Sequence, residues 1–317
     1  MTATLDASSA AASPGRSIEG FRPSTVVTDD GVRLAVYERP TDRPDAPTLF
    51  LVNGLGGNLI TWRHQIARLG PYYRIITWDY RGLYASALTP AQKSAGVALD
   101  VPRHAQDAIA ILDHFEVERA VFVGWSMGVQ LNFELAQIVA DRIIGMIQIA
   151  GSYGRSLATT WFGKPGERLI MPAMGVFKHI VANGGRIIDK AIASGLLLGA
   201  ARRLGVVAPS IDMAVTRELV AAYVKLDFDV YNKILATLGD HDAEAALPTL
   251  DVPVLVLAGD RDPMTPAWLS RRMADEIPDA ELVIVPGGSH YVPIEFPARV
   301  NEALVDWLRR KLGHDLG

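Results

Sequence analysis

The chain has 317 residues, of which 49% are hydrophobic, so it can bury a large core as one α/β domain with an insertion or as two domains. Its formal net charge is −4, from 31 basic and 35 acidic residues, and no basic block stands out, which excludes the footprint of a nucleic-acid-binding protein. The absence of cysteine excludes disulfides and thiol chemistry and is consistent with the cytoplasm, where we expect the protein.

The first 23 residues are rich in Ala and Ser and lack both the basic start and the apolar run of a signal peptide, so we predict a disordered tail over 1–23. Residues 24–38 alternate between apolar and polar around Asp30-Gly31, which predicts a β-hairpin with its turn there.

A buried strand over 47–52 runs into the glycine-rich stretch Asn53-Gly-Leu-Gly-Gly-Asn58. Its spacing fits neither the P-loop nor the dinucleotide fingerprint. We therefore interpret it as a loop whose backbone amides face a reacting carbonyl oxygen. A helix over 59–69, a strand over 73–79 and a helix over 101–115 follow.

The next strand, 120–123, leads into Gly124-Trp-Ser-Met-Gly128, and an apolar helical run over 129–140 follows. A G-x-S-x-G motif between a strand and a helix is typical of a nucleophile elbow. The two glycines leave room for the sharp reversal, so Ser126 is predicted at an exposed tip. The Met127 amide lies at the helix N-terminus, where partial positive charge favours an oxyanion.

After a strand over 142–150 the pattern changes, because residues 152–247 contain no convincing strand. Four helices are predicted there, over 165–183, 186–203, 211–227 and 229–239. We interpret 152–247 as a helical cap inserted into a core domain of 24–151 and 248–313. Its apolar residues are expected both to pack on the core and to line an acyl pocket. The longest apolar run, 191–201, is too short to cross a bilayer, so no transmembrane segment is expected.

The α/β pattern then resumes. A strand over 252–259 ends in Asp260 and Asp262, a helix follows over 266–277, and a strand over 280–286 leads through two glycines to His290. A helix over 296–312 closes the chain. Continuous apolar strands alternating with amphipathic helices predict a mostly parallel sheet covered on both faces.

Three residue types in this pattern suit acyl transfer. A serine hydroxyl needs a neighbouring base, an imidazole can take and return a proton near neutral pH, and a buried carboxylate holds the imidazole in the right tautomer. All the candidates directly follow predicted strands, whose carboxyl ends share one edge of a parallel sheet. Of the seven histidines, only His290 follows a strand through a glycine pair. His241, in the polar loop after the predicted cap, remains a minor candidate for a substrate contact.

Together these motifs resemble the α/β-hydrolase fold superfamily of the Ser-Asp-His type, over about residues 24 to 312. The resemblance rests on the serine motif, on Asp79-Tyr-Arg-Gly82, on Gly259-Asp-Arg-Asp262 with Pro266, and on Gly287-Gly-Ser-His290. It implies a triad of Ser126, Asp262 and His290. Asp262 is preferred to Asp260 because the acid of that family lies three residues after a glycine and four before a proline. Asp79 and Arg81 are expected to tie loops together.

The resemblance also implies that the Leu55 and Met127 amides form an oxyanion hole. Many relatives have His where this chain has Asn53. In the stretch where this chain has Tyr84, relatives often have a glycine, and the Tyr84 side chain is expected to narrow the entrance to the active site. Asn53, Tyr84 and Trp125, the neighbour of the serine, are our candidates for substrate contact.

The expected function is hydrolysis of a small-molecule carboxylic ester through an acyl-enzyme on Ser126. The predicted substrate has a hydrophobic acyl or alkyl group, such as a monoacylglycerol or a medium-chain ester. No cofactor, metal or nucleic acid is expected, and a homodimer is left open. Two alternatives stay open: a C–C bond hydrolase or enol-lactonase with the same triad, and a non-catalytic ligand receptor with this fold.

Overall fold

The computed structural model describes residues 20–43, 45–159 and 207–314. Between the last two ranges it also describes residues 168, 170–176, 178–181, 183–184, 190 and 194–203. The predicted tail lies outside the described residues up to position 19. The first strand begins at Arg22, so the folded part starts slightly before the predicted residue 24.

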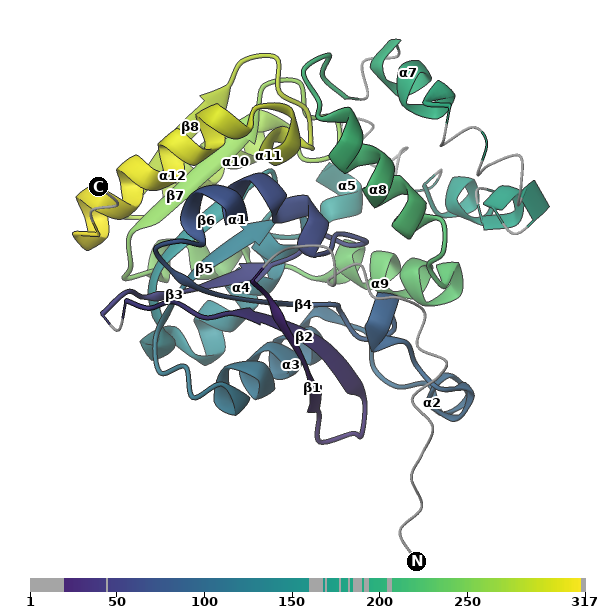
Figure 1. Ribbon diagram of the computed structural model, residues 1–317, viewed down its shortest axis with the longest axis horizontal. Helices are drawn as coiled ribbons and strands as arrows, with labels where there is room; N and C mark the ends of the chain where they lie inside the picture. Colours follow the sequence, from purple (N-terminus) through teal and green to yellow (C-terminus); the bar gives the residue numbers. More distant parts are fainter. Residues whose placement is uncertain are drawn as a thin grey trace, which may run out of the picture.

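Eight strands form one sheet in the described part of the chain, in the order β1-β2-β4-β3-β5-β6-β7-β8 (Figure 1). They are β1 (Arg22–Val27), β2 (Arg33–Arg39), β3 (Thr48–Val52), β4 (Arg74–Trp78), β5 (Ala120–Trp125), β6 (Ile143–Ile149), β7 (Val254–Gly259) and β8 (Ala280–Val285). β2 is antiparallel to both β1 and β4, and the other neighbouring pairs are parallel. The predicted mostly parallel sheet and the hairpin around Gly31 are therefore confirmed.

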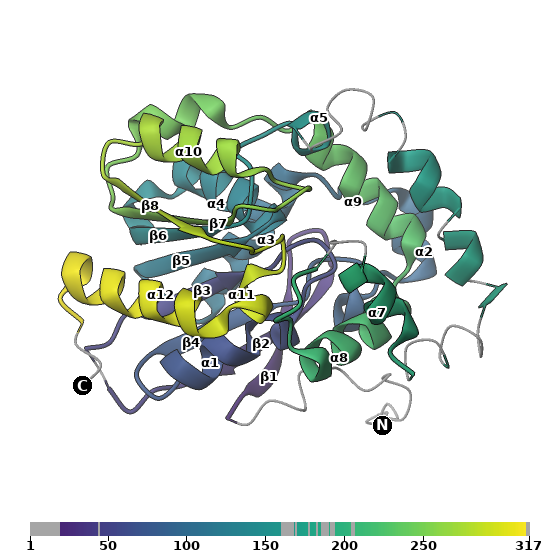
Figure 2. The ribbon, with the colours of Figure 1, turned by 90° about the horizontal axis from the view of Figure 1, so that it is seen from above.

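The sheet is flanked by helices on both faces (Figure 2). These are α1 (Arg63–Leu69), α3 (Val101–His114), α4 (Met127–Ile138), α10 (Ala267–Glu276), α11 (Val292–Glu295) and α12 (Pro297–Leu312), whereas α2 (Pro90–Ala95) lies at the edge of the molecule, where its Lys93 pairs with Asp227. α2 and α11 were not predicted.

Capping residues set the limits of several helices. The Asp100 carboxylate accepts a hydrogen bond from the Arg103 amide at the start of α3, and Gly313, with φ of +70°, ends α12.

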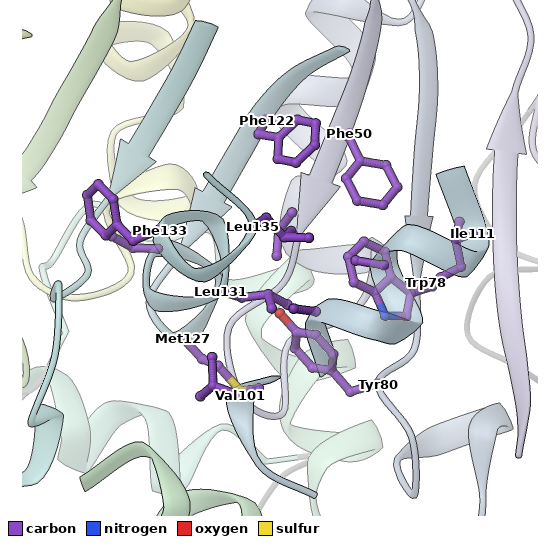
Figure 3. Close-up of a cluster of buried hydrophobic side chains, with 14 of the residues drawn as sticks. Phe50, Trp78, Tyr80, Val101, Ile111, Phe122, Met127, Leu131, Phe133 and Leu135 are labelled. Carbon is purple, nitrogen blue, oxygen red and sulfur yellow. The ribbon is translucent and has the colours of Figure 1, made fainter. Parts of the chain in front are cut away.

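Alternate residues of the central strands pack on opposite faces, as a two-residue period requires. In β3, Phe50 packs toward α3 and α4, whereas Leu49 and Leu51 pack toward α1 and α12. Figure 3 shows the first of these clusters, in which Phe50 stacks on Trp78 with 4.8 Å between ring centroids, beside Leu131 and Leu135 of α4. The core thus fixes β3, β5 and α4, the elements that carry the glycine-rich loop and the serine.

Where the structure describes it, the segment between β6 and β7 consists of helices joined by turns and loops. It contains α5 (Ser156–Thr159), α7 (Leu196–Arg203), α8 (Met213–Tyr223) and α9 (Phe228–Asp240), which lie near one end of the sheet (Figure 1). The predicted helices over 211–227 and 229–239 correspond to α8 and α9. The helix predicted over 186–203 is interrupted by a turn at 194–195, with residue 190 helical before it and α7 after it, and residues 186–189 and 191–193 lie outside the described residues.

For the predicted helix over 165–183, residues 165–167, 169, 177 and 182 lie outside the described residues, and those described are helical. Phe228, Val230 and Ile234 of α9 belong to the same buried cluster as α3 and α4. The apolar face of α9 therefore packs on the core, which was one of the two roles predicted for the apolar residues of this segment. Whether 152–247 is a separate cap stays a prediction. Among the described helices, none combines the length and apolar character that crossing a bilayer requires.

Candidate active site

Ser126 lies between β5 and α4 in a strained backbone conformation, with φ of +56° and ψ of −117°. Its amide donates to the carbonyl of Ile149, and its carbonyl accepts from the Val129 amide, each at 3.0 Å. The flanking glycines are sterically required. A Cβ at Gly128 would lie 2.1 Å from the Val52 carbonyl oxygen, and one at Gly124 would lie 2.7 Å from the carbonyl oxygen of Gly128. The strand-to-helix turn thus presents the hydroxyl at the carboxyl edge of the sheet.

The structure brings Ser126, His290 and Asp262 together from three separate loops. His290 Nε2 lies 2.8 Å from Ser126 Oγ, and His290 Nδ1 lies 2.9 Å from Asp262 Oδ2. The histidine and aspartate side chains are buried, whereas the serine is half-buried. This geometry lets the imidazole take the serine proton at one nitrogen while the carboxylate orients the ring at the other.

Four donors surround the Asp262 carboxylate. Oδ1 accepts from the Met264 and Thr265 amides at 2.8 and 2.9 Å. Oδ2 accepts from the Thr265 hydroxyl at 2.7 Å and faces the His290 ring. Asp260 is exposed and accepts from the Gly287 amide at 2.6 Å, so it ties two loops together. The imidazole is therefore paired with Asp262, the preferred of the two candidates.

The glycine-rich loop after β3 borders the serine. A Cβ at Gly54 would lie 3.0 Å from Ser126 Cβ and 2.7 Å from the Trp125 ring. In the part of the chain that the structure describes, neither the Leu55 nor the Met127 amide has a hydrogen-bond acceptor. Both N–H groups are therefore available to donate, and their role as an oxyanion hole stays a prediction.

The polar atoms of two predicted substrate contacts, Asn53 and Trp125, are bonded within the scaffold. Asn53 is buried, and its side chain donates to the Trp78 carbonyl at 2.7 Å and accepts from Trp62 Nε1 at 2.8 Å. Trp125 is also buried, and its Nε1 donates to the His290 carbonyl at 2.9 Å. Because the polar atoms of both side chains are engaged in the scaffold, we assign them to positioning the loop and the histidine.

Tyr84, the third predicted contact, is half-buried and has φ of +48°. Its hydroxyl donates to the carbonyl of Gly56 in the glycine-rich loop. Burial raises the pKa of this phenol far above its usual value, so the group stays protonated and remains a donor. Tyr84 therefore braces the loop that carries Leu55, a role compatible with the predicted narrowing of the entrance.

Asp79 and Arg81 lie beside the site without joining the triad. Asp79 accepts from the Tyr37 hydroxyl at 2.9 Å and the Ala85 amide at 3.2 Å, and burial raises its pKa to about 7. Arg81 is fully buried and pairs with Asp107 and Asp30. Both side chains tie loops together, as expected.

His241, the minor candidate, contacts α4. Its Nε2 lies 3.0 Å from Glu134 Oε2, and its Nδ1 lies 3.2 Å from Gln130 Nε2. These contacts hold the end of α9 against the helix that follows the serine. The structure gives His241 no contact with the triad among the described residues.

Two supporting residues were missed in the sequence. Thr265 supplies both an amide and a hydroxyl to Asp262, and the Asp-x-x-Thr spacing, a capping pattern, could have revealed it. Glu295 is buried and accepts from the Ser289 amide and hydroxyl at 2.7 and 2.6 Å, and from the Ala208 amide at 2.6 Å. No local signal marked Glu295, because its partners are distant in the chain or lie in an irregular loop.

Comparisons with known proteins identify related hydrolases. Residues 49–303 match the model of the Alpha/beta hydrolase family. The chain is similar to the 3-oxoadipate enol-lactonase 2 of Acinetobacter baylyi (strain ATCC 33305 / BD413 / ADP1), with 27% identity over 306 residues, 92% of this chain and 97% of that protein. It is also similar to a protein of Stutzerimonas stutzeri (strain A1501) named as a carbamate hydrolase, RutD, with 25% identity over 282 residues, 85% of this chain and 94% of that one.

Among solved structures, a hydrolase from Pseudomonas aeruginosa PA01 superposes with a TM-score of 0.70 and 25% identity, over 90% of this chain and 98% of that chain. The shared fold extends over nearly the whole of both proteins. The site described above therefore lies in a fold that this hydrolase shares.

Proposed function

Because this chain belongs to the alpha/beta hydrolase family, and its named relatives support hydrolase activity, we propose that it is a serine hydrolase of carboxylic esters. The observation that carries the proposal is the continuous hydrogen-bonded path from Ser126 Oγ through the His290 ring to Asp262, with heavy-atom distances of 2.8 and 2.9 Å. Asp262, His290 and Ser126 then act as orienting acid, general base and nucleophile.

In the first half of the reaction, His290 Nε2 takes the hydroxyl proton as Ser126 Oγ attacks the ester carbonyl carbon. The negative oxygen of the tetrahedral intermediate accepts hydrogen bonds from the Leu55 and Met127 amides. The C–O bond to the alcohol then breaks, and the His290 imidazolium gives the alcohol its proton. An acyl-serine remains.

In the second half, a water molecule gives a proton to His290 and attacks the acyl carbon. The second intermediate collapses, and Ser126 recovers its proton as the acid leaves. Asp262 stays ionised throughout, holding the Nδ1–H of His290 and stabilising the imidazolium that forms in each half. Every group in this cycle comes from the chain itself, apart from the ester and water.

The proposed substrate class is a neutral ester with a largely apolar acyl or alkyl group, such as a medium-chain ester or a monoacylglycerol. Aromatic side chains near the serine support this proposal. The rings of Tyr223 and Tyr231 contact the glycine-rich loop at Gly56, and the Phe228 ring packs on both at 5.5 and 5.8 Å between centroids. Such rings offer apolar surface to a hydrocarbon chain.

A second candidate is hydrolysis of an enol lactone. The likeness to the 3-oxoadipate enol-lactonase 2 spans almost the full length of both chains, and a lactone is a cyclic ester that the same triad can open. Ring opening follows the same steps, except that the leaving oxygen remains bonded to the far end of the acyl chain, both in the acyl-serine and in the open-chain acid that water then releases.

A fluorophosphonate probe tests the proposal directly, because it labels only an activated serine. We expect intact-mass analysis to show one adduct on the native protein and none on Ser126→Ala. Absence of the adduct from the native protein would overturn the proposal and favour the ligand-receptor alternative.

A series of p-nitrophenyl esters from acetate to decanoate then tests the substrate class. We expect kcat/KM to peak at a medium chain length. Highest activity on acetate would contradict the acyl-pocket proposal. Inactivity on all the esters, in a protein that the probe labels, would favour the enol-lactonase or the C–C bond hydrolase.

A further inference from the structure

The backbone on both sides of His290 is bound to one buried carboxylate. Glu295 ends the short helix α11 that follows the histidine, and its side chain is buried. Its Oε2 accepts from the Ser289 amide at 2.7 Å, and its Oε1 accepts from the Ser289 hydroxyl at 2.6 Å. The same hydroxyl accepts from the Tyr291 amide at 3.3 Å. Glu295 therefore holds the residue before the histidine directly and the residue after it through a hydroxyl.

The carboxylate of Glu295 is itself held in place by other parts of the chain. Its Oε1 also accepts from the Ala208 amide at 2.6 Å, and the backbone amide of Glu295 donates to the Tyr291 carbonyl at 3.0 Å. Ile294, the preceding residue, belongs to the same small buried cluster as Val207, the neighbour of Ala208. The side chain of Glu295 is thus anchored from the segment before α8 as well as from its own helix.

The donors around Glu295 require a carboxylate and not only a side chain of this shape. Two backbone amides and one hydroxyl point at its two oxygens, and an ionised carboxyl group is the side chain that only accepts hydrogen bonds. A glutamine in the same place would turn an N–H group toward one of the two amides. A buried N–H group without an acceptor is costly, so the loop would shift to relieve it.

The position of the His290 ring has to satisfy two partners at once. Nε2 lies 2.8 Å from Ser126 Oγ, and Nδ1 lies 2.9 Å from Asp262 Oδ2. The bond from Trp125 Nε1 fixes the His290 carbonyl, and Glu295 fixes the residues on either side. A displacement of about 1 Å in reacting groups can cost about a hundredfold in rate, so these backbone contacts matter for turnover.

We propose that Glu295 is a positioning residue that holds His290 in line with Ser126 and Asp262 through the two residues that flank the histidine. The inference rests on the proposed hydrolysis at Ser126 and adds to it a residue outside the triad. Among the described residues, Glu295 has hydrogen bonds to Ser289 and Ala208 and none to a triad side chain. Its effect on the reaction therefore passes through the loop that carries His290 and should appear in kcat.

The variant Glu295→Gln tests the proposal, because it keeps the shape of the side chain and replaces one acceptor by a donor. We expect kcat on a p-nitrophenyl ester to fall by about ten- to a hundredfold, with KM within about twofold of the native value. Labelling with a fluorophosphonate to completion counts the functional serines, and kcat is expressed per labelled serine. A variant that is merely less well folded then has a native kcat on this scale.

Ser289→Ala is a milder variant that still decides the question if Glu295→Gln does not fold. It deletes the hydroxyl that links Glu295 to the Tyr291 amide and leaves the two backbone amides on the carboxylate. We expect kcat to fall by about three- to tenfold at constant KM. Ser270→Ala is the matched control, because Ser270 is also buried and its hydroxyl has no partner among the described residues, and its kcat should equal the native one.

Proton NMR gives a readout that a purely structural role would not move. The Nδ1 proton of His290, bound to Asp262, should give a signal far downfield of other imidazole protons in the native protein and in Ser270→Ala. In Glu295→Gln and Ser289→Ala we expect this signal to shift or broaden, because the ring no longer keeps a single position against the carboxylate.

A native kcat per labelled serine in Glu295→Gln would overturn the inference, as would equal values for Ser289→Ala and Ser270→Ala. A rise in KM at constant kcat would show a role in substrate binding and would also overturn it, as would an unchanged Nδ1 proton signal in the two test variants. Failure of the underlying function looks different, because the fluorophosphonate adduct on Ser126 would then be absent from the native protein.

Discussion

Two loops of this protein invite comparison, because each follows the carboxyl end of a parallel strand and each contains a buried carboxylate. After β7, Asp262 receives two backbone amides and a hydroxyl and faces an imidazole. After β4, Asp79 receives the Tyr37 hydroxyl and the Ala85 amide on a single oxygen, and its other oxygen, Oδ1, has no partner among the described residues. Burial accordingly raises the pKa of Asp79 to about 7.

The difference teaches that a strand end and burial do not by themselves make a catalytic acid. A carboxylate removed from water keeps its charge only where donors replace the lost hydration. Asp262 has such donors on both oxygens and a ring nitrogen in line with Oδ2. Asp79 has donors on one oxygen only, and its contacts all lie within the scaffold. The loop after β7 can support proton transfer, whereas the loop after β4 holds neighbouring loops together.

The largest expected effect is on turnover. Asp262→Asn should lower kcat by about 10³- to 10⁴-fold, because an amide cannot hold the Nδ1–H tautomer of His290 or stabilise its charged form. Asp79→Asn makes the same change in the other loop and should lower kcat by less than about tenfold. Steady-state kinetics on one p-nitrophenyl ester measure both. Comparable losses in the two variants would contradict the assignment of the acid.

A smaller effect is expected from removing one donor in each loop. Thr265→Val deletes the hydroxyl that donates to Asp262 Oδ2 and should lower kcat about tenfold at nearly constant KM, since hydrogen bonds to charged groups contribute about 1.5 to 3 kcal/mol. Tyr37→Phe deletes the corresponding donor to Asp79 and should change kcat by less than about twofold. If Thr265→Val turned over at the native rate, the donor count around Asp262 would not matter for catalysis.

The smallest effect concerns stability as a function of pH. The pKa of Asp79 is about 7 in the folded protein against 3.8 for an ordinary aspartate, so between these values the folded state keeps a proton that the unfolded state has released. The contribution of Asp79 to the free energy of unfolding should therefore fall as pH rises from about 4 to about 7. Above about pH 7 this contribution should stay constant.

Urea unfolding of the native protein and Asp79→Asn at pH 5 and pH 8 measures this contribution. From pH 5 to pH 8, the free energy of unfolding of the native protein should fall by at least about 1 kcal/mol more than that of the variant, which is roughly the equivalent of one pKa unit. Parallel pH profiles for the two proteins would show that Asp79 is already ionised at pH 5.

Much of the fold could be predicted because local pattern sets it. The apolar runs of β3, β5, β6 and β7 were all found, and the glycines at 124 and 128 predicted the turn around Ser126 that the structure shows. The limits of the helices near residues 186–203 were less well predicted, and the short helices α2 and α11 were missed. Short amphipathic segments carry little periodic signal, and packing on the rest of the chain decides where they form.

Part of the candidate active site could also be predicted from local sequence pattern. The nearness of Ser126, His290 and a carboxylate followed from their places after strands, since parallel strands bring such residues to one edge, whereas the choice of Asp262 over Asp260 came from the family resemblance. The roles of Asn53 and Trp125 did not, because a polar or aromatic residue beside a nucleophile looks the same in sequence whether it faces the substrate or the scaffold. Only the bonds to Trp78, Trp62 and His290 decide that.

The sequence by itself determined which chemical groups this protein holds and in what order they follow the strands, because strand periodicity and the steric demands of glycine are local properties. Tertiary structure alone brought the imidazole of His290 against the expected Asp262, and it alone bonded the Asn53 and Trp125 side chains into the scaffold. Those outcomes depend on contacts between residues far apart in the chain, such as His290 with Asp262, 28 positions away, and with Trp125, 165 positions away.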